Sequence, residues 1–457
     1  MNIYDTIAAV STPYGVGGVA LIRISGDEAI KFASKVCSRP LFVVDSGSAE
    51  YRKIVSPDGH VIDDAIVTVF RAPRSFTGED TVEISCHGGI KVTEEVLHAV
   101  IAAGARPAEA GEFTRRAFLS GKISLERAEA IGSLLYAKTS EQVKLFSGGA
   151  ADALGEKARA IYGDIATLLA DMYARIDFPE EDLGSISDDE IIKRLTDIES
   201  ELSSLLGTYK CGHAISEGIK TVICGRTNAG KSSLYNRLVG RDAAIVTDIE
   251  GTTRDTLEDT IPLGRLTLRL SDTAGLRESD DAVEKIGIGR AKEKIAESEL
   301  VIALFDGTKK LSPEDEMLLR EITEQSKEGS CVFVINKCDA DVKTDRARLR
   351  SLGEVVEISA KTGAGIDELI RKIEKRYIDA ECDITRDALI INERQFYAVK
   401  GALDALVLAK NSMLLSMTQD VCSIDLESAM SCLSELGGNS VSEDVVARIF
   451  SKFCVGK

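Results

Sequence analysis

The 457-residue sequence predicts a protein of α/β and all-α type with several domains. A mixed α/β domain is expected first, then a helical domain, with a second α/β domain of mostly parallel sheet inserted into the helical one. Three observations support this fold class. The first 122 residues contain short apolar runs, which are typical of strands. Apolar residues spaced three and four positions apart follow them, as in helices. Between residues 217 and 379, apolar runs alternate with glycine-rich loops. The length fits about three domains.

The first domain, residues 1–122, is expected to contain short strands and a helix. The strand-like runs are Val19–Ile24, Ala65–Phe70 and Thr81–Cys86, each bounded by Gly, Pro or charged residues. A helix is expected at Lys91–Ala103, and Gly104 ends it.

The helical domain is expected in two parts, residues 123–216 and 380–457. Helical spacing begins at Leu125 and stops at Phe178, and a new helix follows Ser187, which forms a candidate capping box with Glu190. The later expected helices are Glu393–Leu415, Asp425–Leu436 and Ser442–Phe453. Because helical stretches flank residues 217–379 on both sides, these residues are predicted to form a domain inserted into the helical one. Insertion is tolerated where the two ends of the inserted domain lie close together.

The inserted section opens with a phosphate-binding loop. Residues 225–233, Gly-Arg-Thr-Asn-Ala-Gly-Lys-Ser-Ser, have the form GxxxxGK[ST] and separate the strand-like run Thr221–Cys224 from a helical stretch. Glycines allow backbone N–H groups to close on phosphates. Lys231 is expected to reach the outer phosphates, and Ser232 is expected to hold Mg²⁺.

Four further loops follow in the order that a guanine-nucleotide switch requires. They are Gly251-Thr-Thr253, Asp272-Thr-Ala-Gly275, Asn336-Lys-Cys-Asp339 and Ser359-Ala-Lys361, the last three after strand-like runs. A carboxylate at Asp339 can accept from the ring N–H and the exocyclic amine of guanine, which adenine cannot match. These loops predict a domain that binds and hydrolyses GTP. Its expected nucleotide-binding residues are Asn228, Ala229, Gly230, Lys231, Ser232, Ser233, Gly251, Thr252, Thr253, Asp272, Thr273, Ala274, Gly275, Asn336, Lys337, Asp339, Ser359, Ala360 and Lys361.

Composition narrows the remaining possibilities. Hydrophobic residues at 44% and charged residues at 28% are ordinary for a soluble globular protein, and no apolar run approaches the roughly 18–20 residues that span a bilayer. Ten cysteines without a CxxC pair predict reduced, mostly buried thiols in a cytoplasmic protein. The net charge of −18 weighs against wrapping nucleic acid by bulk electrostatics, although it leaves room for a local basic patch.

Motifs outside the GTPase loops indicate a family. They are Thr12-Pro-Tyr-Gly-Val-Gly-Gly18, Leu21-Ile-Arg-Ile-Ser-Gly26, Ser75-Phe-Thr-Gly-Glu-Asp80, Gly111-Glu-Phe-Thr-Arg-Arg-Ala-Phe-Leu119, Ile176-Asp-Phe-Pro179 and Phe453-Cys-Val-Gly-Lys457. With these, the whole chain resembles the MnmE (TrmE) family of tRNA-modification GTPases, within the TrmE-Era-EngA-like GTPases.

The resemblance implies partners and a reaction. It implies a cytoplasmic homodimer joined through the N-terminal domains, and a heterotetramer or larger complex with the FAD protein MnmG. That complex adds an aminomethyl or carboxymethylaminomethyl group to carbon 5 of the wobble uridine of certain tRNAs. The one-carbon unit would come from 5-formyl- or 5,10-methylene-tetrahydrofolate in the N-terminal domain, residues 1–122. The folate positions carried over by the resemblance are Arg23, Glu83, Lys122 and Lys457.

The resemblance also implies the ions and the catalytic group. It adds Thr247, Asp248, Ile249 and Glu250 to the nucleotide loops, and it implies a K⁺ site at Asn228, Thr247, Ile249 and Thr252, with Ser232 and Thr253 on Mg²⁺. Leu276 follows Gly275, and an apolar side chain cannot orient the attacking water. In this family the group that orients it is a glutamate further along, which is Glu284 here.

Three alternatives stay open at this stage. An Era-like ribosome-assembly GTPase shares the fold but typically appends a basic RNA-binding domain. An interaction scaffold with vestigial hydrolysis would not need the intact Lys231, Ser232 and Glu284. Arg23 and Glu83 could also be strand residues with exposed charges.

Overall fold

The computed structural model describes residues 5–177, 186–242, 259–270, 293–327, 329–378, 383–438 and 442–456. Two compact units divide the chain: residues 1–135, 155–196 and 401–457 form unit 1, and residues 136–154 and 197–400 form unit 2. Three of the four boundaries fall within the long helices α6 (Ala150–Asp177), α7 (Asp188–Gly207) and α15 (Glu393–Leu414), and the other lies between residues 135 and 136.

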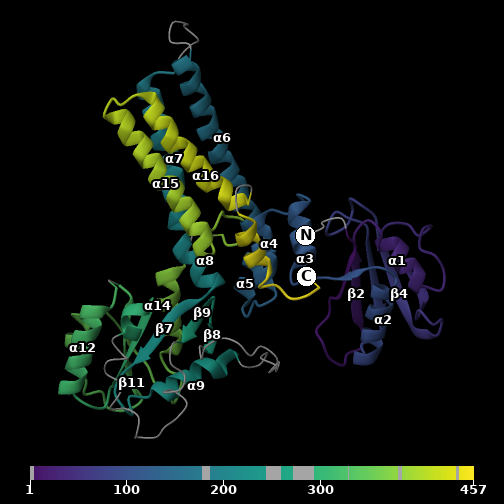
Figure 1. The fold of residues 1–457 in the computed structure, drawn as a ribbon. Helices are drawn as coiled ribbons and strands as arrows, with labels where there is room; N and C mark the ends of the chain where they lie inside the picture. Colours follow the sequence, from purple (N-terminus) through teal and green to yellow (C-terminus); the bar gives the residue numbers. More distant parts are fainter. Residues whose placement is uncertain are drawn as a thin grey trace. The chain divides into compact units, whose positions relative to one another are not determined.

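Unit 1 begins with a six-stranded sheet of strand order β3-β4-β5-β2-β1-β6. All neighbouring strands are antiparallel except β1 and β6, which are parallel. The strands are β1 (Ile7–Val10), β2 (Ala20–Ser25), β3 (Ala49–Val55), β4 (Val61–Phe70), β5 (Thr81–Cys86) and β6 (Arg106–Pro107). Helices α1 (Ala29–Val36) and α2 (Ile90–Ala102) cover one face of the sheet (Figure 1), where Ile22, Val67 and Ile84 are fully buried. The mixed α/β fold expected for this region is confirmed.

A buried ionic network holds the start of the chain against this domain. The guanidinium of Arg116, which is 5% exposed, contacts Asp5 at 2.7 Å and Glu79 and Glu112 at 3.1 Å each. Arg106 binds the same Asp5 and Glu112 carboxylates at 2.7 Å each. Burial raises the pKa of Glu112, but the hydrogen bonds from Arg106 and from the backbone outweigh it, so the pKa lies below its usual value.

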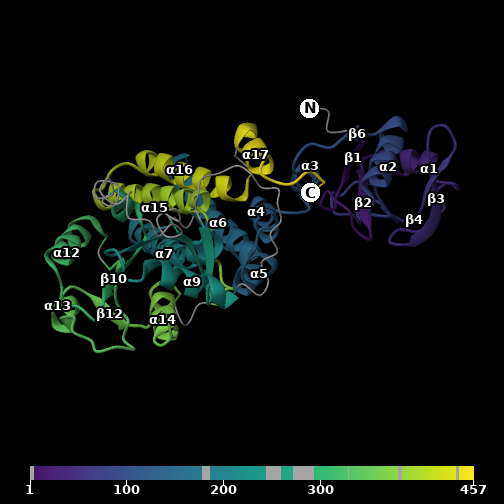
Figure 2. The ribbon, with the colours of Figure 1, turned by 90° about the horizontal axis from the view of Figure 1, so that it is seen from below.

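The rest of unit 1 is helical. Its helices are α3 (Glu112–Leu119), α4 (Leu125–Leu134), the larger parts of α6 and α15, the first part of α7, α16 (Gln419–Gly437) and α17 (Glu443–Phe450). Helix α16 runs beside residues 401–414 of α15 in both views (Figures 1 and 2), where the Cys422 thiol donates to the Ala409 carbonyl at 3.4 Å. The expected cap of α7 is confirmed in one half only. The Ser187 hydroxyl accepts from the Glu190 N–H at 3.2 Å, but the Glu190 carboxylate binds Arg194 instead of returning to the cap.

Unit 2 contains α5 (Ser140–Ser147), α8 (Tyr209–Ser216) and a second six-stranded sheet of order β12-β11-β10-β7-β9-β8. Every neighbouring pair is parallel except β8 and β9. The elements are β7 (Ile219–Cys224), α9 (Lys231–Asp242), β8 (Asp259–Leu263), β9 (Leu266–Leu270), β10 (Leu300–Asp306), α12 (Pro313–Gln325), β11 (Cys331–Asn336), α13 (Arg346–Arg350), β12 (Glu354–Glu357) and α14 (Ile366–Tyr377). The mostly parallel sheet predicted for the inserted section is confirmed. Leu319 and Ile322 of α12 pack on Phe305 and Phe333 of its central strands.

Two composition-based expectations have structural counterparts. Nine cysteines within the described ranges are free thiols, and all of them except the exposed Cys454 are buried or half-buried. Over the same ranges, no helix combines the length and the apolar character needed to cross a membrane.

The last described residues, 451–456, pack on the first domain within unit 1. The Ser11 hydroxyl donates to the Gly456 carbonyl at 2.9 Å, and Val455 forms a β-bridge with Ala110. Gly111, with a φ of 67°, lies directly against helix α17, and a Cβ atom there would collide with the Phe450 carbonyl oxygen. This contact therefore requires a glycine.

Replacing Gly111 by Ala should destabilise unit 1 more than replacing Gly121. Both glycines have positive φ, 67° and 71°, so each alanine costs about 1 kcal/mol of backbone strain. At Gly121 the added methyl meets open space, whereas at Gly111 it overpacks against Phe450 and costs about 1–3 kcal/mol more. Thermal unfolding of the full chain checks this prediction. Equal melting temperatures for the two variants would contradict it.

Candidate nucleotide-binding site

The expected nucleotide loops that the structure describes follow the carboxyl ends of neighbouring parallel strands. Residues 225–230 follow β7, residues 337–339 follow β11, and residues 359–361 follow β12 after Ile358. Carboxyl ends of parallel strands meet at one edge of a sheet, where α/β proteins bind their ligands. Strand β10, which lies between β7 and β11, ends at the same edge with Asp306.

The loop after β7 has the conformation that a phosphate-binding loop needs. Three of its residues have positive φ: Gly225 at 149°, Asn228 at 64° and Gly230 at 103°. A Cβ atom at Gly225 would collide with the Leu304 carbonyl oxygen, and one at Gly230 would collide with the Asn336 side chain. The glycines of the motif are therefore required by close packing as well as by phosphate approach.

Helix α9 starts at Lys231, directly after this loop. Its amino end presents backbone N–H groups, which attract anions together with the helix dipole. The Lys231 ammonium donates to the carbonyls of Gly225 at 2.7 Å and Arg226 at 3.1 Å, which folds the side chain over the loop. Ser232 is half-buried and Ser233 is exposed at the same helix end.

Asn336 joins two of the expected loops. Its side chain is buried, its Nδ2 donates to the Ala229 carbonyl at 2.8 Å, and its Oδ1 accepts from the Ala360 N–H at 2.9 Å. The phosphate loop and the Ser359–Lys361 loop are therefore fixed to one side chain. Arg237 of α9 adds a second link, because its guanidinium donates to the Ala360 and Lys361 carbonyls.

Lys337 contacts the phosphate loop through its side chain. Its Nζ donates to the Asn228 carbonyl at 2.8 Å and pairs with Asp306 at 2.7 Å. Burial raises the pKa of Asp306, but the hydrogen bonds from Lys337 and Thr308 outweigh it and bring the pKa below its usual value. Asp306 therefore stays charged and keeps the lysine in place. Asp306 was not among the expected site residues. The feature of the sequence that could have indicated it is its position at the end of the apolar strand β10.

Asp339 projects into solvent next to the Ser359 loop. A hydrogen bond from the Ser359 side chain, followed by one from its own backbone and by the charge of Lys361, lowers the pKa of Asp339. The carboxylate is therefore ionised and exposed, as an acceptor for guanine must be.

Other expected residues of this site lie outside the described residues. They are Thr247, Asp248, Ile249, Glu250, Gly251, Thr252, Thr253, Asp272, Thr273, Ala274, Gly275 and Glu284. Within the described ranges no group of three or more His, Cys, Asp or Glu side chains could hold a metal ion. The Ser232 hydroxyl and the Asn228 oxygens are nevertheless hard donors of the kind that Mg²⁺ and K⁺ take.

The expected folate positions lie in unit 1. Arg23 on β2 and Glu83 on β5 are directly opposite partners, and their side chains form an ion pair at 2.8 Å. The Arg23 guanidinium lies over the rings of Phe76 and Phe113, at 5.9 and 5.7 Å from the centroids. The Lys122 ammonium donates to the Pro73 carbonyl at 2.9 Å. Lys457 lies outside the described residues.

Comparison with known proteins fits this geometry. A model of the MnmE helical domain matches residues 125–454, and a model of the GTP-binding protein TrmE N-terminus matches residues 6–122. The chain belongs to the MnmE family. The tRNA modification GTPase MnmE of Heliobacterium modesticaldum is 41% identical over 468 residues, and that of Acetivibrio thermocellus is 38% identical over 459 residues. Each of these alignments covers 99% of both chains.

The protein is therefore a GTPase of tRNA modification, as the MnmE resemblance predicted. Among solved structures, the G domain of the T. maritima FeoB iron transporter is 29% identical and matches 35% of this chain and 98% of its own. The TM-score of that match is 0.26.

Replacing Asp339 by Asn should change the base that this MnmE-family site accepts. The variant would lose the carboxylate that we expect to accept from two guanine donors, at a cost of about 2–4 kcal/mol, and xanthine nucleotide should then be preferred. Binding of GTP and XTP checks this, with the exposed neighbour Asp341→Asn as a control that keeps GTP preference. Normal GTP affinity in Asp339→Asn, without gain for XTP, would mean that another group recognises the base.

Proposed function

We propose that this protein is a K⁺-dependent GTPase that works as a cytoplasmic homodimer with the FAD protein MnmG. Together they would add a (carboxymethyl)aminomethyl group to carbon 5 of the wobble uridine of certain tRNAs. The one-carbon donor would be 5-formyl- or 5,10-methylene-tetrahydrofolate. The GTPase part is supported by one observation above all, the Asn336 side chain that ties the phosphate loop to the Ser359–Lys361 loop.

In this proposal residues 1–122 bind folate and form the dimer, and residues 217–379 hydrolyse GTP. Residues 123–216 and 380–457 are the two parts of the helical domain. The proposal assigns the described nucleotide contacts to Asn228, Ala229, Gly230, Lys231, Ser232, Ser233, Asn336, Lys337, Asp339, Ser359, Ala360 and Lys361.

Hydrolysis would proceed mainly by positioning and by electrostatic stabilisation. Lys231 can leave the Gly225 and Arg226 carbonyls for the outer phosphates, because the amine is already directed over the loop. Ser232 would hold Mg²⁺ and Asn228 would hold K⁺, and these ions would neutralise the charge that develops on the phosphates. Glu284 would orient the attacking water in place of Leu276.

K⁺ should accelerate GTP hydrolysis by this protein relative to Na⁺ at equal ionic strength. In this proposal Asn228 and switch-segment oxygens hold the cation, and its positive charge would take the place of an arginine finger at the phosphates. The rate in Na⁺ should be lower by at least about tenfold, which is roughly 1.4 kcal/mol of barrier. Steady-state phosphate release measures it. Equal rates in the two salts would remove the cation from the proposal.

The folate assignment is supported by the chemistry of Arg23 and Glu83. A carboxylate can accept two hydrogen bonds from the guanidine-like edge of a pterin, and a guanidinium can bind a carboxylate or formyl oxygen. The pair is half-buried between neighbouring strands, with 17% and 23% of the side chains exposed, and it borders the Phe76 and Phe113 rings. Phe113 is fully buried, so the Phe76 ring and the Arg23 and Glu83 side chains are the groups that a ligand could reach.

Arg23→Ala should abolish binding of 5-formyl-tetrahydrofolate and leave basal GTP hydrolysis close to wild type. The reason is that Arg23 lies in unit 1, whereas the nucleotide loops lie in unit 2. Calorimetry with the full chain measures the binding, and the melting temperature shows whether the domain is still folded. The exposed Arg39→Ala is the matched control in the same domain. Unchanged folate binding in a folded Arg23→Ala variant would remove Arg23 from the site.

A further inference from the structure

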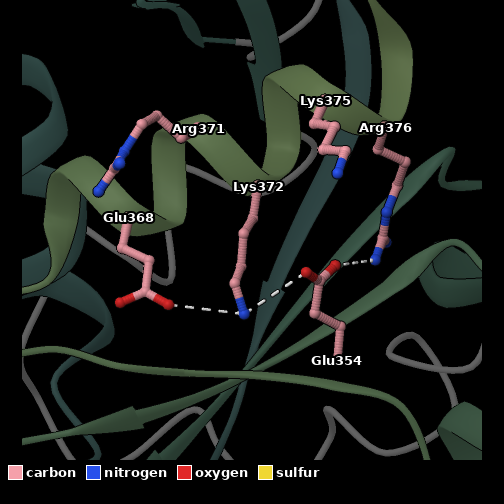
Figure 3. A pocket seen from close by; sticks show the side chains of 6 residues that line it. All are labelled: Glu354, Glu368, Arg371, Lys372, Lys375 and Arg376. Carbon is pink, nitrogen blue, oxygen red and sulfur yellow. Dashed lines mark hydrogen bonds and ion pairs between the residues drawn. The ribbon is translucent and has the colours of Figure 1, made fainter.

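A basic hollow lies in unit 2 on helix α14 and strand β12, and none of its lining residues belongs to the nucleotide loops (Figure 3). Its lining residues are Glu354, Glu368, Arg371, Lys372, Lys375 and Arg376. Four of the six residues from 371 to 376 are basic, although the whole chain has a net charge of −18. This concentration of positive charge therefore needs its own explanation.

The four cations form two pairs, each with a spacing of four residues along α14. The first pair, Lys372 and Arg376, is bridged by the Glu354 carboxylate, with its two oxygens 3.5 Å from the Lys372 Nζ and 2.9 Å from an Arg376 nitrogen. The second pair is Arg371 and Lys375, and both are exposed. Among the residues that the structure describes, neither forms an ion pair (Figure 3).

Like charges four residues apart on a helix repel each other. Glu354 offsets this repulsion for the first pair, whereas the second pair has no carboxylate between its side chains. A cation near the end of a helix can also be explained by the helix dipole, and Lys375 lies in the last turn of α14. That explanation does not reach Arg371, which lies in the middle of the helix Ile366–Tyr377.

We propose that this hollow is a docking surface for the phosphate backbone of tRNA, with Arg371 and Lys375, whose side chains point apart along α14 (Figure 3), each contacting a phosphate. A guanidinium binds phosphate oxygens through two parallel hydrogen bonds, and structured RNA is recognised largely through its shape and phosphates. The proposal rests on tRNA being the substrate, and not on the folate donor or on K⁺.

The test compares Arg371→Gln/Lys375→Gln with wild type in binding an in vitro tRNA transcript over a range of salt concentrations. Glutamine keeps helix propensity and removes the charge. The double variant should bind about tenfold more weakly at low salt, and the slope of log K against log salt should fall by about one per lost contact. GTP hydrolysis without tRNA should not change, because neither side chain contacts a nucleotide loop.

The matched control is Lys310→Gln/Arg320→Gln, which removes two exposed cations elsewhere in unit 2. This control should leave tRNA affinity and its salt slope close to wild type. Unchanged binding in the Arg371/Lys375 variant would overturn the proposal, as would an equal loss in both double variants or a wild-type chain that does not bind the transcript. An effect on binding of an acidic protein without an effect on tRNA would overturn it too. None of these outcomes bears on folate binding or on K⁺ dependence.

Discussion

The buried amide of Asn336 connects the phosphate loop to the loop after β12 at the edge of the parallel sheet. It satisfies one carbonyl of the phosphate loop and one N–H of the loop after β12, and both hydrogen bonds are buried. An unsatisfied buried backbone group costs about 1–3 kcal/mol, so removing the amide affects two loops at once. Gly230 follows from the same contact, because any larger residue there would occupy the space of the Asn336 side chain. The sequence of the phosphate loop is thus partly dictated by a residue more than 100 positions away.

Much of this site could be predicted from the sequence because each nucleotide loop is a contiguous motif after an apolar strand. The amphipathic helices were predictable for the same reason, since their spacing is local. What could not be predicted is the pairing of distant groups. The sequence around Arg116 does not indicate that its guanidinium binds Asp5, which lies 111 residues earlier. Asp306 was missed because a fully apolar run such as Leu300–Phe305 does not by itself say which polar residue after it faces a site.

The arrangement of charged residues likewise depends on pairing between distant parts of the chain. The negative net charge of the chain follows from its composition, and it argued against a protein whose surface is mostly basic. The net charge did not reveal how cations are arranged locally. On α14, Glu354 forms ion pairs with Lys372 and Arg376 but not with Arg371 and Lys375. The difference arises because Glu354 lies on strand β12, which passes beside only one face of the helix. For the folate candidates, the sequence left open whether Arg23 and Glu83 were isolated exposed charges. The structure places them opposite each other in a half-buried ion pair.

The contact between Ser11 and Gly456 has a consequence for the order in which the molecule is completed during synthesis. The two residues are 445 positions apart, and ribosomes add about 5–20 residues per second. The first domain therefore waits on the order of 20–90 s after Ser11 is made before the residues that pack on it exist. During that interval the Ala110 backbone lacks its bridge to Val455, and the surface around Gly111 lacks helix α17. Until α17 and residues 451–456 have been made, the first domain exposes the surface that they cover in the folded protein.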